Sequence, residues 1–428
     1  MAQISSLMIR GSVLLIGLAS NVLLARWLGV ADFGEYVLLA SIVLLPGQAL
    51  ASTNLQLMTR AVGTIPGGGV CFRRLGLGAL LAWGLTVVAL LVGVLLFAMH
   101  RGWLVVDADY RGQFLLICVA TALLMAACGT QQGILRGLGL VALSEYPMLV
   151  GRTVLGLTVL AVLAAGAWLD VPRALTVQPL TLLLIALFLF WALRRRAEPG
   201  RAPGSAPPGA NGVHASYLTI LSVSSLAPLS AMLGVFGAGA LGDRADVANL
   251  RVAESLAMLV TLPQVWANVA VSPRFARFWS EQNMGALRGE YLKHAREAFL
   301  VAFLVALVVL LAGETLVAVL YGASYAQGLA SVLLPLTLGH LFSAYAGSSG
   351  QLLIMAGFER WALSSQVLGV VTAVAAMPVL FGEFGLPGIA LATSLGIITT
   401  NLAARIFVHH RLPVALPLLL FLRNKDAG

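Results

Sequence analysis

Long apolar runs broken by short polar segments constrain this chain more than any other feature of its sequence. At one break, LARWLGVADFGEY (residues 24–36), the run SSLMIRGSVLLIGLASNVL precedes and VLLASIVLLPGQALAS follows. Crossing the hydrocarbon core of a bilayer takes roughly 20 mostly apolar residues as a helix. Only helices and closed barrels can span it, because backbone polar groups find no water there. The runs are continuous and not alternating, which excludes a barrel. The sequence therefore predicts an all-α, polytopic membrane protein.

Charge and cysteine content agree with this class. Only 10% of the 428 residues are charged and 60% are hydrophobic, whereas a soluble domain carries about 25% charged residues. The formal net charge of +9 needs no nucleic-acid partner, because basic loops on the cytoplasmic side of a membrane account for it. The cysteines, Cys71, Cys118 and Cys128, lack metal-site spacing and are predicted to be inert thiols. We expect no metal and no cofactor.

The apolar runs divide into about twelve candidate helices. Their expected spans are 4–27, 35–59, 75–99, 113–135, 141–165, 175–193, 217–241, 247–272, 297–320, 329–356, 361–381 and 386–408. The first run is long enough to span and has no small-residue cleavage site, so we interpret it as a retained helix and not a signal peptide. The break at LARWLGVADFGEY is then a tight outer turn, which Gly29 and Gly34 allow.

Lysine and arginine predict the orientation, because they gather in the cytoplasmic loops of membrane proteins. With the amino terminus inside, most basic residues fall in loops on that side, including Arg73, Arg74, Arg136 and the run at 194–196. The opposite loops hold few basic residues and many acids. Both termini are therefore predicted to be cytoplasmic.

One Pro-, Gly- and Ala-rich segment, RRRAEPGRAPGSAPPGANG at 194–212, divides the chain into halves of nearly equal length. Its composition is that of a flexible linker. We expect a six-helix lobe at 1–193, a cytoplasmic linker at 194–216, a second six-helix lobe at 217–408 and a cytoplasmic tail at 409–428.

The halves are predicted to be repeats of each other. ADFGEY at 31–36 and ADVANL at 245–250 both follow a Leu-Gly pair, and GLGLVALSE at 137–145 resembles GFERWALSS at 357–365. The two members of each matched pair lie between corresponding helices of the two halves. Because each half has an even number of helices, the repeats run parallel, and two such lobes around a central cavity suit alternating access.

Several segments resemble the polysaccharide-export flippases (Wzx-like) of the multidrug/oligosaccharidyl-lipid/polysaccharide (MOP) exporter superfamily. They are LARWLGVADFGEYVLLAS, QQGILRGLGLVALSE, VSPRFARFWSE and LYGASYAQGLASVLLPLTLGHLFSAYAGSSGQLLIMAGFERWALSSQ. The resemblance covers essentially the whole chain through the order and spacing of loose motifs. It implies twelve helices in two lobes and export of lipid-linked saccharides across a bacterial inner membrane.

Charged residues inside the predicted helices form the candidate site, because each costs about 2.5–3.5 kcal/mol on insertion scales. Arg152 lies about 17 Å into its helix, with Glu145 two turns earlier on the same face. Arg251 and Glu254 lie one turn apart, and Arg10 lies near the inner end of the first helix. We predict that the three arginines contact a phosphate, since arginine binds phosphate bidentately. In the related flippases, basic residues that line the central cavity, including residues of the eighth helix, look like the family's phosphate contacts. This resemblance supports Arg251, which lies in the eighth expected helix, more than Arg152. Alternatively, Glu145 and Glu254 neutralise Arg152 and Arg251 for packing.

Glu145 and Glu254 are the only carboxylates that we place within helices, so they are also candidates for ion coupling. Four amides are candidate sugar contacts, although amides also hold membrane helices together: Asn54, Gln131, Gln264 and Asn268.

The energy source is predicted from what the chain lacks. No phosphate-binding loop ending in GK[ST] occurs in the sequence, so ATP is not hydrolysed by this chain. We expect the membrane potential, or a proton or sodium gradient, to drive transport. A kink at Pro46 or Pro263, in matching second helices, would let the lobes bend.

The sequence predicts a transporter and not an enzyme, with no catalytic residues. The expected activity is that of a flippase for an undecaprenyl-linked or similar oligosaccharide, in the bacterial inner membrane. Its expected partners are membrane lipid, the lipid-linked oligosaccharide and the polysaccharide polymerase with other export machinery, and the chain is expected to be a monomer. A cation-coupled drug or metabolite antiporter is one alternative. A membrane glycosyltransferase or polymerase is another, which the short predicted outer loops disfavour.

Overall fold

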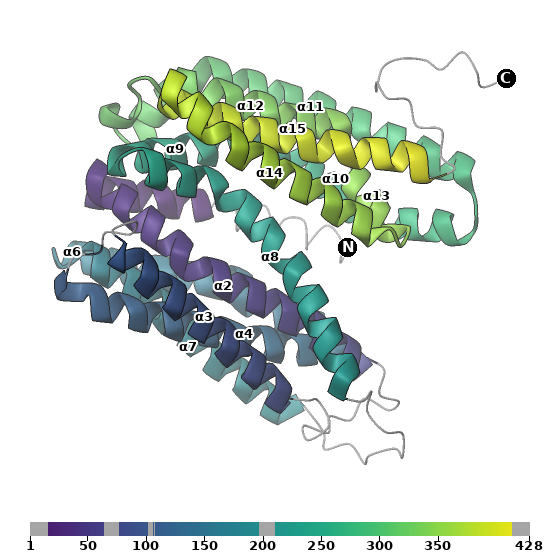
Figure 1. Ribbon diagram of the computed structural model, residues 1–428, viewed down its shortest axis with the longest axis horizontal. Helices are drawn as coiled ribbons and strands as arrows, with labels where there is room; N and C mark the ends of the chain where they lie inside the picture. The colour runs from purple at the N-terminus through teal and green to yellow at the C-terminus, as the bar shows by residue number, and fades with distance from the viewer. Residues whose placement is uncertain (1–15, 64–76, 102–105, 107, 197–209, 413–428) are drawn as a thin grey trace. The chain divides into compact units, whose positions relative to one another are not determined.

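The computed structural model describes residues 16–63, 77–101, 106, 108–196 and 210–412. Every regular element within these residues is a helix (Figure 1). Of the described helices, 9 are long and apolar enough to cross a bilayer. The chain is therefore a multi-pass membrane protein, and the predicted all-α fold class is confirmed.

The chain divides into two compact units. Unit 2 contains Trp27–Leu229 and the first described helix, Ile16–Leu28, as far as Ser20. Its further elements are α2 (Val30–Gly63), α3 (Leu77–His100), a 3-10 turn η2 (Ala108–Tyr110), α4 (Arg111–Gly137), α5 (Val141–Tyr146), a π turn η3 (Pro147–Gly151), α6 (Arg152–Ala165), α7 (Val171–Arg196) and the first part of α8 (Ala210–Leu241).

Unit 1 contains Asn21–Arg26 and the chain from Ser230 onward. Its elements after α8 are α9 (Arg244–Ala257), a 3-10 turn η4 (Met258–Thr261), α10 (Leu262–Ser280), α11 (Met284–Leu320), a 3-10 turn η5 (Ala323–Tyr325), α12 (Leu329–Ala346), α13 (Ser349–Met355), α14 (Glu359–Phe384) and α15 (Leu386–Arg411).

Three of the expected helices are interrupted. The span 329–356 divides into α12 and α13, because Gly347 has a φ of 70° that ends the first helix. The span 247–272 divides at η4, directly before Pro263, which stands in the first turn of α10 where a missing N–H is tolerated. The span 141–165 contains the π turn that begins at Pro147. By contrast, α2 runs unbroken through Pro46.

The turn at LARWLGVADFGEY is tighter than expected. The first helix ends at Leu28, Gly29 has a φ of 81°, and α2 begins at Val30. Gly29 alone provides the left-handed residue, which glycine adopts without strain. Gly34, expected at the turn, lies within α2. Glu35 is buried and accepts a hydrogen bond from the Tyr110 hydroxyl.

The turns that join the matched segments of the proposed repeats share a glycine conformation. Gly139, before α5, has a φ of 79°, and Gly357, before α14, has a φ of 81°. Gly139 therefore matches Gly357 in backbone conformation. The alignment of the two segments in sequence instead pairs Gly357 with Gly137, two residues earlier.

α2 and α4 pack closely because α4 carries glycine at every fourth position, at Gly129, Gly133 and Gly137. A Cβ atom at Gly129 would lie 2.3 Å from the Ala51 carbonyl oxygen, and one at Gly133 would lie 2.7 Å from the Leu55 carbonyl oxygen. Stripes of small residues let backbones approach, and this packing drives helix association in lipid.

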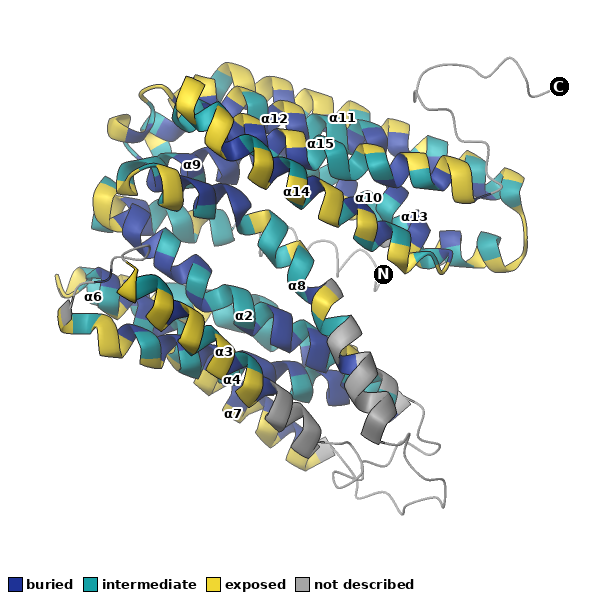
Figure 2. Cartoon of the chain, in the orientation of Figure 1, coloured by how far each residue is buried: buried dark blue, intermediate teal, exposed yellow. Residues whose placement is uncertain are grey.

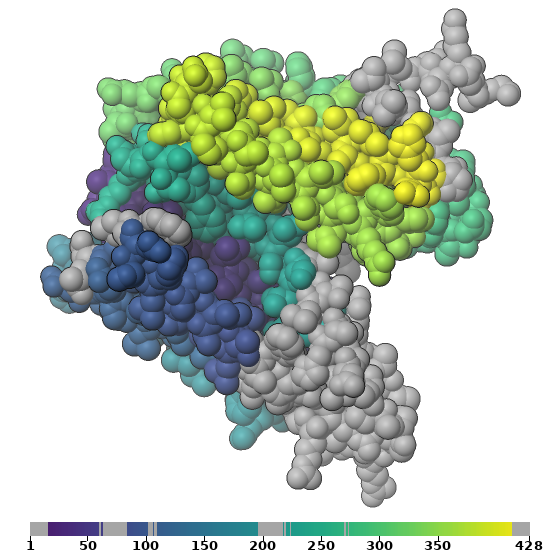
Figure 3. All heavy atoms as spheres, viewed as in Figure 1, coloured from purple at the N-terminus to yellow at the C-terminus, as the bar shows by residue number. Residues whose placement is uncertain are grey.

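α14 shows how the chain divides between protein and lipid contacts. Its buried face is made of small and flexible residues: Ala362, Ser365, Gly369, Ala373 and Met377. Its exposed face is aliphatic (Figure 2): Val367, Leu368, Val371, Val374 and Val379. The buried face packs on α15, and the two helices form one continuous surface (Figure 3). Large aliphatic side chains outside and small ones inside are expected for a helix that contacts lipid.

Candidate functional site

Arg152 opens α6 directly after the π turn, within unit 2. One of its guanidinium nitrogens donates to Gln178 Oε1 of α7 at 2.9 Å. Gln178 Nε2 in turn donates to the Tyr36 hydroxyl at 3.4 Å. Among the described residues, no carboxylate forms an ion pair with Arg152. The half-buried guanidinium therefore rests on a neutral amide.

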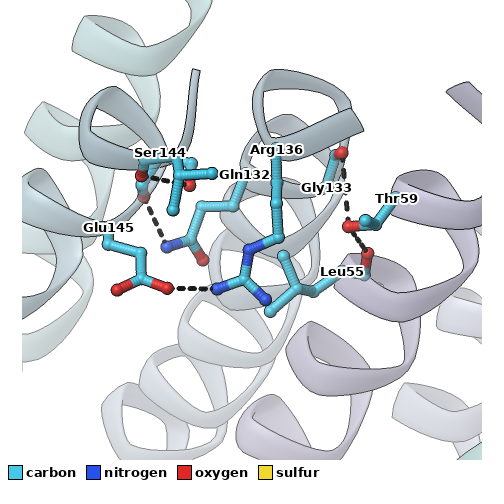
Figure 4. Close-up of polar contacts among 8 residues, drawn as sticks. Leu55, Thr59, Gln132, Gly133, Arg136, Ser144 and Glu145 are labelled. Carbon is cyan, nitrogen blue, oxygen red and sulfur yellow. Dashed lines mark hydrogen bonds and ion pairs between the residues drawn. The ribbon is translucent and has the colours of Figure 1, made fainter. Parts of the chain in front are cut away.

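Glu145 faces a different arginine from the one expected. Arg136 at the end of α4 forms an ion pair with Glu145 Oε1 of α5 (Figure 4). Beside it, Gln132 Nε2 donates to the Ser144 carbonyl at 2.7 Å. These contacts fasten α4 to α5. The alternative interpretation, in which Glu145 neutralises Arg152, is wrong.

The same close-up shows how α2 meets this end of α4. The Thr59 hydroxyl donates to the Leu55 carbonyl at 2.6 Å, within α2, and lies 3.4 Å from the Gly133 carbonyl oxygen of α4 (Figure 4). The close approach at Gly133 therefore allows a hydrogen bond between the helices as well as backbone packing.

Arg251 and Glu254 do form a pair, within α9 of unit 1. Arg251 Nη1 and Glu254 Oε2 lie 3.7 Å apart, and the side chains are 32% and 9% exposed. Next to them, the hydroxyls of Ser255 and Tyr321 share a hydrogen bond of 2.9 Å. Burial raises the pKa of Tyr321, while Ser255 and Arg251 oppose the shift. Tyr321 therefore stays a neutral hydrogen-bonding group beside the ion pair.

Two of the predicted sugar contacts are occupied by helix packing. Asn54 Nδ2 donates to the Ala126 carbonyl at 3.1 Å and to the Thr130 hydroxyl at 3.2 Å. Gln264 Nε2 donates to the Ser343 carbonyl at 3.1 Å, and its Oε1 accepts from the Ser343 hydroxyl at 2.9 Å. Both amides hold two helices of one unit together.

The other two amides retain acceptor capacity. Gln131 Oε1 and Asn268 Oδ1 are buried without a hydrogen-bond partner in the described part of the chain, and Asn54 Oδ1 shares this property. A buried acceptor without a partner carries a free-energy cost, so these oxygens have unmet hydrogen-bonding capacity.

Arg405, in α15 of unit 1, is a buried charge that the sequence analysis did not single out. It is 3% exposed. Its Nη1 donates to the Ala346 carbonyl at 2.8 Å and to the Tyr291 hydroxyl at 3.2 Å. A cation at the carboxyl-terminal end of a helix is stabilised there, so Arg405 caps the end of α12 at its break. The signal was present, because Arg405 is the one basic residue of the predicted span 386–408.

The remaining predictions have mixed outcomes. Arg10 lies outside the described residues. Glu35 in α2 and Glu314 in α11 also lie within helices, so the expectation that only Glu145 and Glu254 do so is wrong. In the described ranges, no group of three or more His, Cys, Asp or Glu residues is placed to hold a metal ion.

Comparison with known proteins identifies the fold. No protein-family profile and no curated protein matches the sequence. Among solved structures, an inward-facing multidrug resistance MATE family transporter of the MOP superfamily superposes with a TM-score of 0.67 at 17% identity, covering 94% of this chain and 97% of that one. The lipid II flippase MurJ in an inward closed conformation gives 0.71 at 12% identity, covering 94% and 86%.

A MOP superfamily transporter from Pyrococcus furiosus gives a TM-score of 0.63 at 16% identity, covering 94% of this chain and 92% of that one. At these identities the similarity establishes the fold. The chain therefore has the fold of the MOP superfamily transporters and flippases.

Proposed function

We propose that this protein is a flippase of the Wzx-like branch of the MOP superfamily. It moves an undecaprenyl-linked or similar lipid-linked oligosaccharide from the inner to the outer leaflet of a bacterial inner membrane. The saccharide then serves cell-surface polysaccharide synthesis, for which O-antigen is one example. The fold supports the proposal, because it is shared with both a multidrug transporter and a lipid II flippase.

Arg152 carries the proposal. A guanidinium without a counter-ion inside a membrane span is costly and is retained where it serves function. Its amide partner Gln178 orients the group without neutralising it. Guanidinium groups bind phosphate through paired, charge-assisted hydrogen bonds. The phosphate or pyrophosphate of a lipid-linked saccharide would supply the anion that Arg152 lacks among the described residues.

Arg251 is the proposed contact from the second half of the chain. Its pairing with Glu254 is long, at 3.7 Å, and its side chain is partly exposed. A phosphate therefore competes with Glu254 for the guanidinium. When no substrate is bound, the pairing with Glu254 keeps the Arg251 side chain in position. The unsatisfied acceptors of Gln131 and Asn268 are the proposed sugar contacts.

The proposed organisation has two six-helix lobes, 1–193 and 217–408, which export by alternating access with both termini cytoplasmic. An anionic head group leaving a negative-inside cell gains about 2.3 kcal/mol per charge per 100 mV. A doubly charged phosphate is thus driven outward by the membrane potential. A polysaccharide polymerase on the outer side is the proposed consumer of the product.

A cation-coupled drug or metabolite antiporter is the second candidate, since several of the similar structures are multidrug transporters. Arg152 argues against a cationic cargo, because a positive charge without a counter-ion repels one. The P. furiosus transporter is described as having a binding pocket whose reverse polarity suggests a different function.

The test is mass spectrometry of lipid-linked saccharides in the source cell after deletion of the gene. Plasmid copies carry the wild type, Arg152→Ala, Arg251→Ala or the control Arg173→Ala, which changes an exposed arginine paired with Asp170. We expect a lipid-linked oligosaccharide to accumulate, and the wild type and the control to clear it. The two site variants should clear it at least about tenfold more slowly, as loss of a charged contact worth 1.5–3 kcal/mol implies.

Other results separate the function from the site. Clearance by all variants would keep the flippase and remove the arginine contacts. No accumulation, together with increased sensitivity to cationic drugs, would replace the flippase by the antiporter.

A further inference from the structure

A small pocket lies at the carboxyl-terminal end of α11, within unit 1. It has a volume of about 390 Å³. Its lining is Glu314, Thr315, Ala318 and Val319 of α11 and Ala326 and Gln327 of the turn before α12. By the predicted orientation, this end of α11 lies at the outer leaflet.

Glu314 is on the lipid-facing side of its helix. It lies six residues before the end of α11, about 9 Å at 1.5 Å per residue. Its side chain is exposed, as are those of Leu307, Leu310 and Leu311, three to seven residues earlier on the same face. A carboxylate among lipid-facing leucines calls for a cationic partner.

The protein supplies no such partner in its described part. Glu314, Thr315 and Gln327 make no hydrogen bond or ion pair there. Three polar side chains that have no partner among the described residues thus line one pocket. Together they offer a negative charge, a hydroxyl and an amide, which suit a group that donates several hydrogen bonds.

A positive charge borders the same pocket. Arg26, at the end of the first helix, donates from Nε to the Leu320 carbonyl at 2.6 Å and from an Nη nitrogen to the Val319 carbonyl. Val319 is also a lining residue. The Tyr325 hydroxyl donates to the Ala25 carbonyl at 3.1 Å and fixes this segment in place. The exposed guanidinium keeps further N–H donors free.

We propose that this pocket binds the head group of an ethanolamine phospholipid that enters sideways from the bilayer. The primary ammonium binds Glu314, with Thr315 and Gln327 as further acceptors, and the lipid phosphate binds Arg26. One fixed charge of each sign matches a zwitterion. A choline head group has no N–H donors, and a glycerol head group brings no cation to Glu314.

The test is native mass spectrometry of the full-length protein in detergent. Dioleoyl phosphatidylethanolamine, phosphatidylcholine or phosphatidylglycerol is added at equal concentrations. We expect the ethanolamine lipid to bind most tightly, and Glu314→Gln to weaken its binding about tenfold. The choline lipid, which keeps the positive charge but has no N–H to donate, should lose less. Arg26→Gln should weaken all three lipids, because each carries the phosphate.

The matched control is Glu383→Gln, which removes an exposed carboxylate near the corresponding end of α14. It should leave ethanolamine lipid binding unchanged. Gln327→Ala is a milder second variant, expected to reduce that binding a few-fold without removing a charge. Equal binding of ethanolamine and choline lipids by the wild type would overturn the proposal. So would equal losses in Glu314→Gln and Glu383→Gln, with both variants eluting as the wild type does on size exclusion.

Discussion

Arg152 donates a hydrogen bond of 2.9 Å to the side-chain oxygen of Gln178, across from α6 to α7. The partner is an amide, so the contact orients the guanidinium without neutralising it, and no carboxylate in the described part of the chain pairs with it. A carboxylate in place of the Gln178 amide would hold the guanidinium in the same position and neutralise its charge. A glutamine at this position is therefore what a binding role of Arg152 requires, whereas a carboxylate would suit a role in packing alone.

Gln178→Glu tests that distinction directly. The new carboxylate would pair with Arg152 and compete with any phosphate, so we expect clearance of the lipid-linked saccharide to fall by about tenfold or more. Thermal stability in detergent should not fall. Gln178→Leu, the control, leaves the guanidinium charged and should keep clearance within about threefold of the wild type. Equal clearance by Gln178→Glu and the wild type would assign Arg152 to packing.

The Arg136–Glu145 pair should behave as a structural contact. The side chains are 34% and 22% exposed, so solvent screens the interaction. We expect Glu145→Gln to lower the free energy of unfolding by only about 1 kcal/mol, with transport retained. The reversed pair, Arg136→Glu with Glu145→Arg, should recover part of the loss. Transport lost at unchanged stability would instead make Glu145 a coupling residue.

Arg405 should contribute more to stability than an exposed arginine of the same helix. Arg405→Met removes charge-assisted hydrogen bonds to Ala346 and Tyr291 at the broken end of α12. We expect a loss of about 2–3 kcal/mol, measured as thermal unfolding in detergent. Arg411→Gln is the control, since Arg411 is exposed and stacks on Trp361. Similar losses in the two variants would contradict the capping role.

The glycine stripe of α4 should not tolerate a side chain. Gly133→Leu would place a Cβ atom 2.6 Å from Met58 Cβ and 2.7 Å from the Leu55 carbonyl oxygen. Overpacking of this kind costs about 1–3 kcal/mol or more. A Cβ atom at Gly156 in α6 would meet nothing within 4 Å, so Gly156→Leu should leave stability unchanged. The comparison requires only unfolding temperatures and yields of folded protein.

The lengths of the apolar runs predicted where the helices lie. The breaks within them depend on individual glycine and proline residues. Apolar runs fixed α14 and α15 to within a few residues, because insertion into lipid depends on summed hydropathy. The break at Gly347 was not visible, since glycine is common inside membrane helices. Pro46 and Pro263 look alike in sequence, yet only Pro263 follows a 3-10 turn.

Of the two predicted charge pairs, Arg251–Glu254 forms and Arg152–Glu145 does not. Arg152 and Glu145 lie on one helical face by spacing, but the π turn between them shifts the register. Glu145 instead forms its ion pair with Arg136, which lies three residues before Gly139. Arg405 was missed because it lies near a helix end, where an arginine commonly extends to the lipid head groups. Only the tertiary contact with Ala346 shows that it turns inward.

Tyr325 provides a pH-dependent contribution to stability. Burial raises the pKa of its hydroxyl, and neighbouring Tyr321 raises it further. Well below pH 10.0, the ordinary pKa of the group, folded and unfolded chains are both protonated and the bond to Ala25 contributes fully. Above it the unfolded chain ionises first, so the contribution is lost as pH rises toward the folded pKa.

The measurement compares unfolding temperatures of the wild type and Tyr325→Phe between about pH 8 and 11. The wild type should be the more stable by about 1 kcal/mol at pH 8, as expected for one buried hydrogen bond. The difference should shrink above the ordinary tyrosine pKa, because only the wild type has this proton to lose. A difference that stays constant across the range would mean that Tyr325 ionises equally in both states and that burial does not hold its proton.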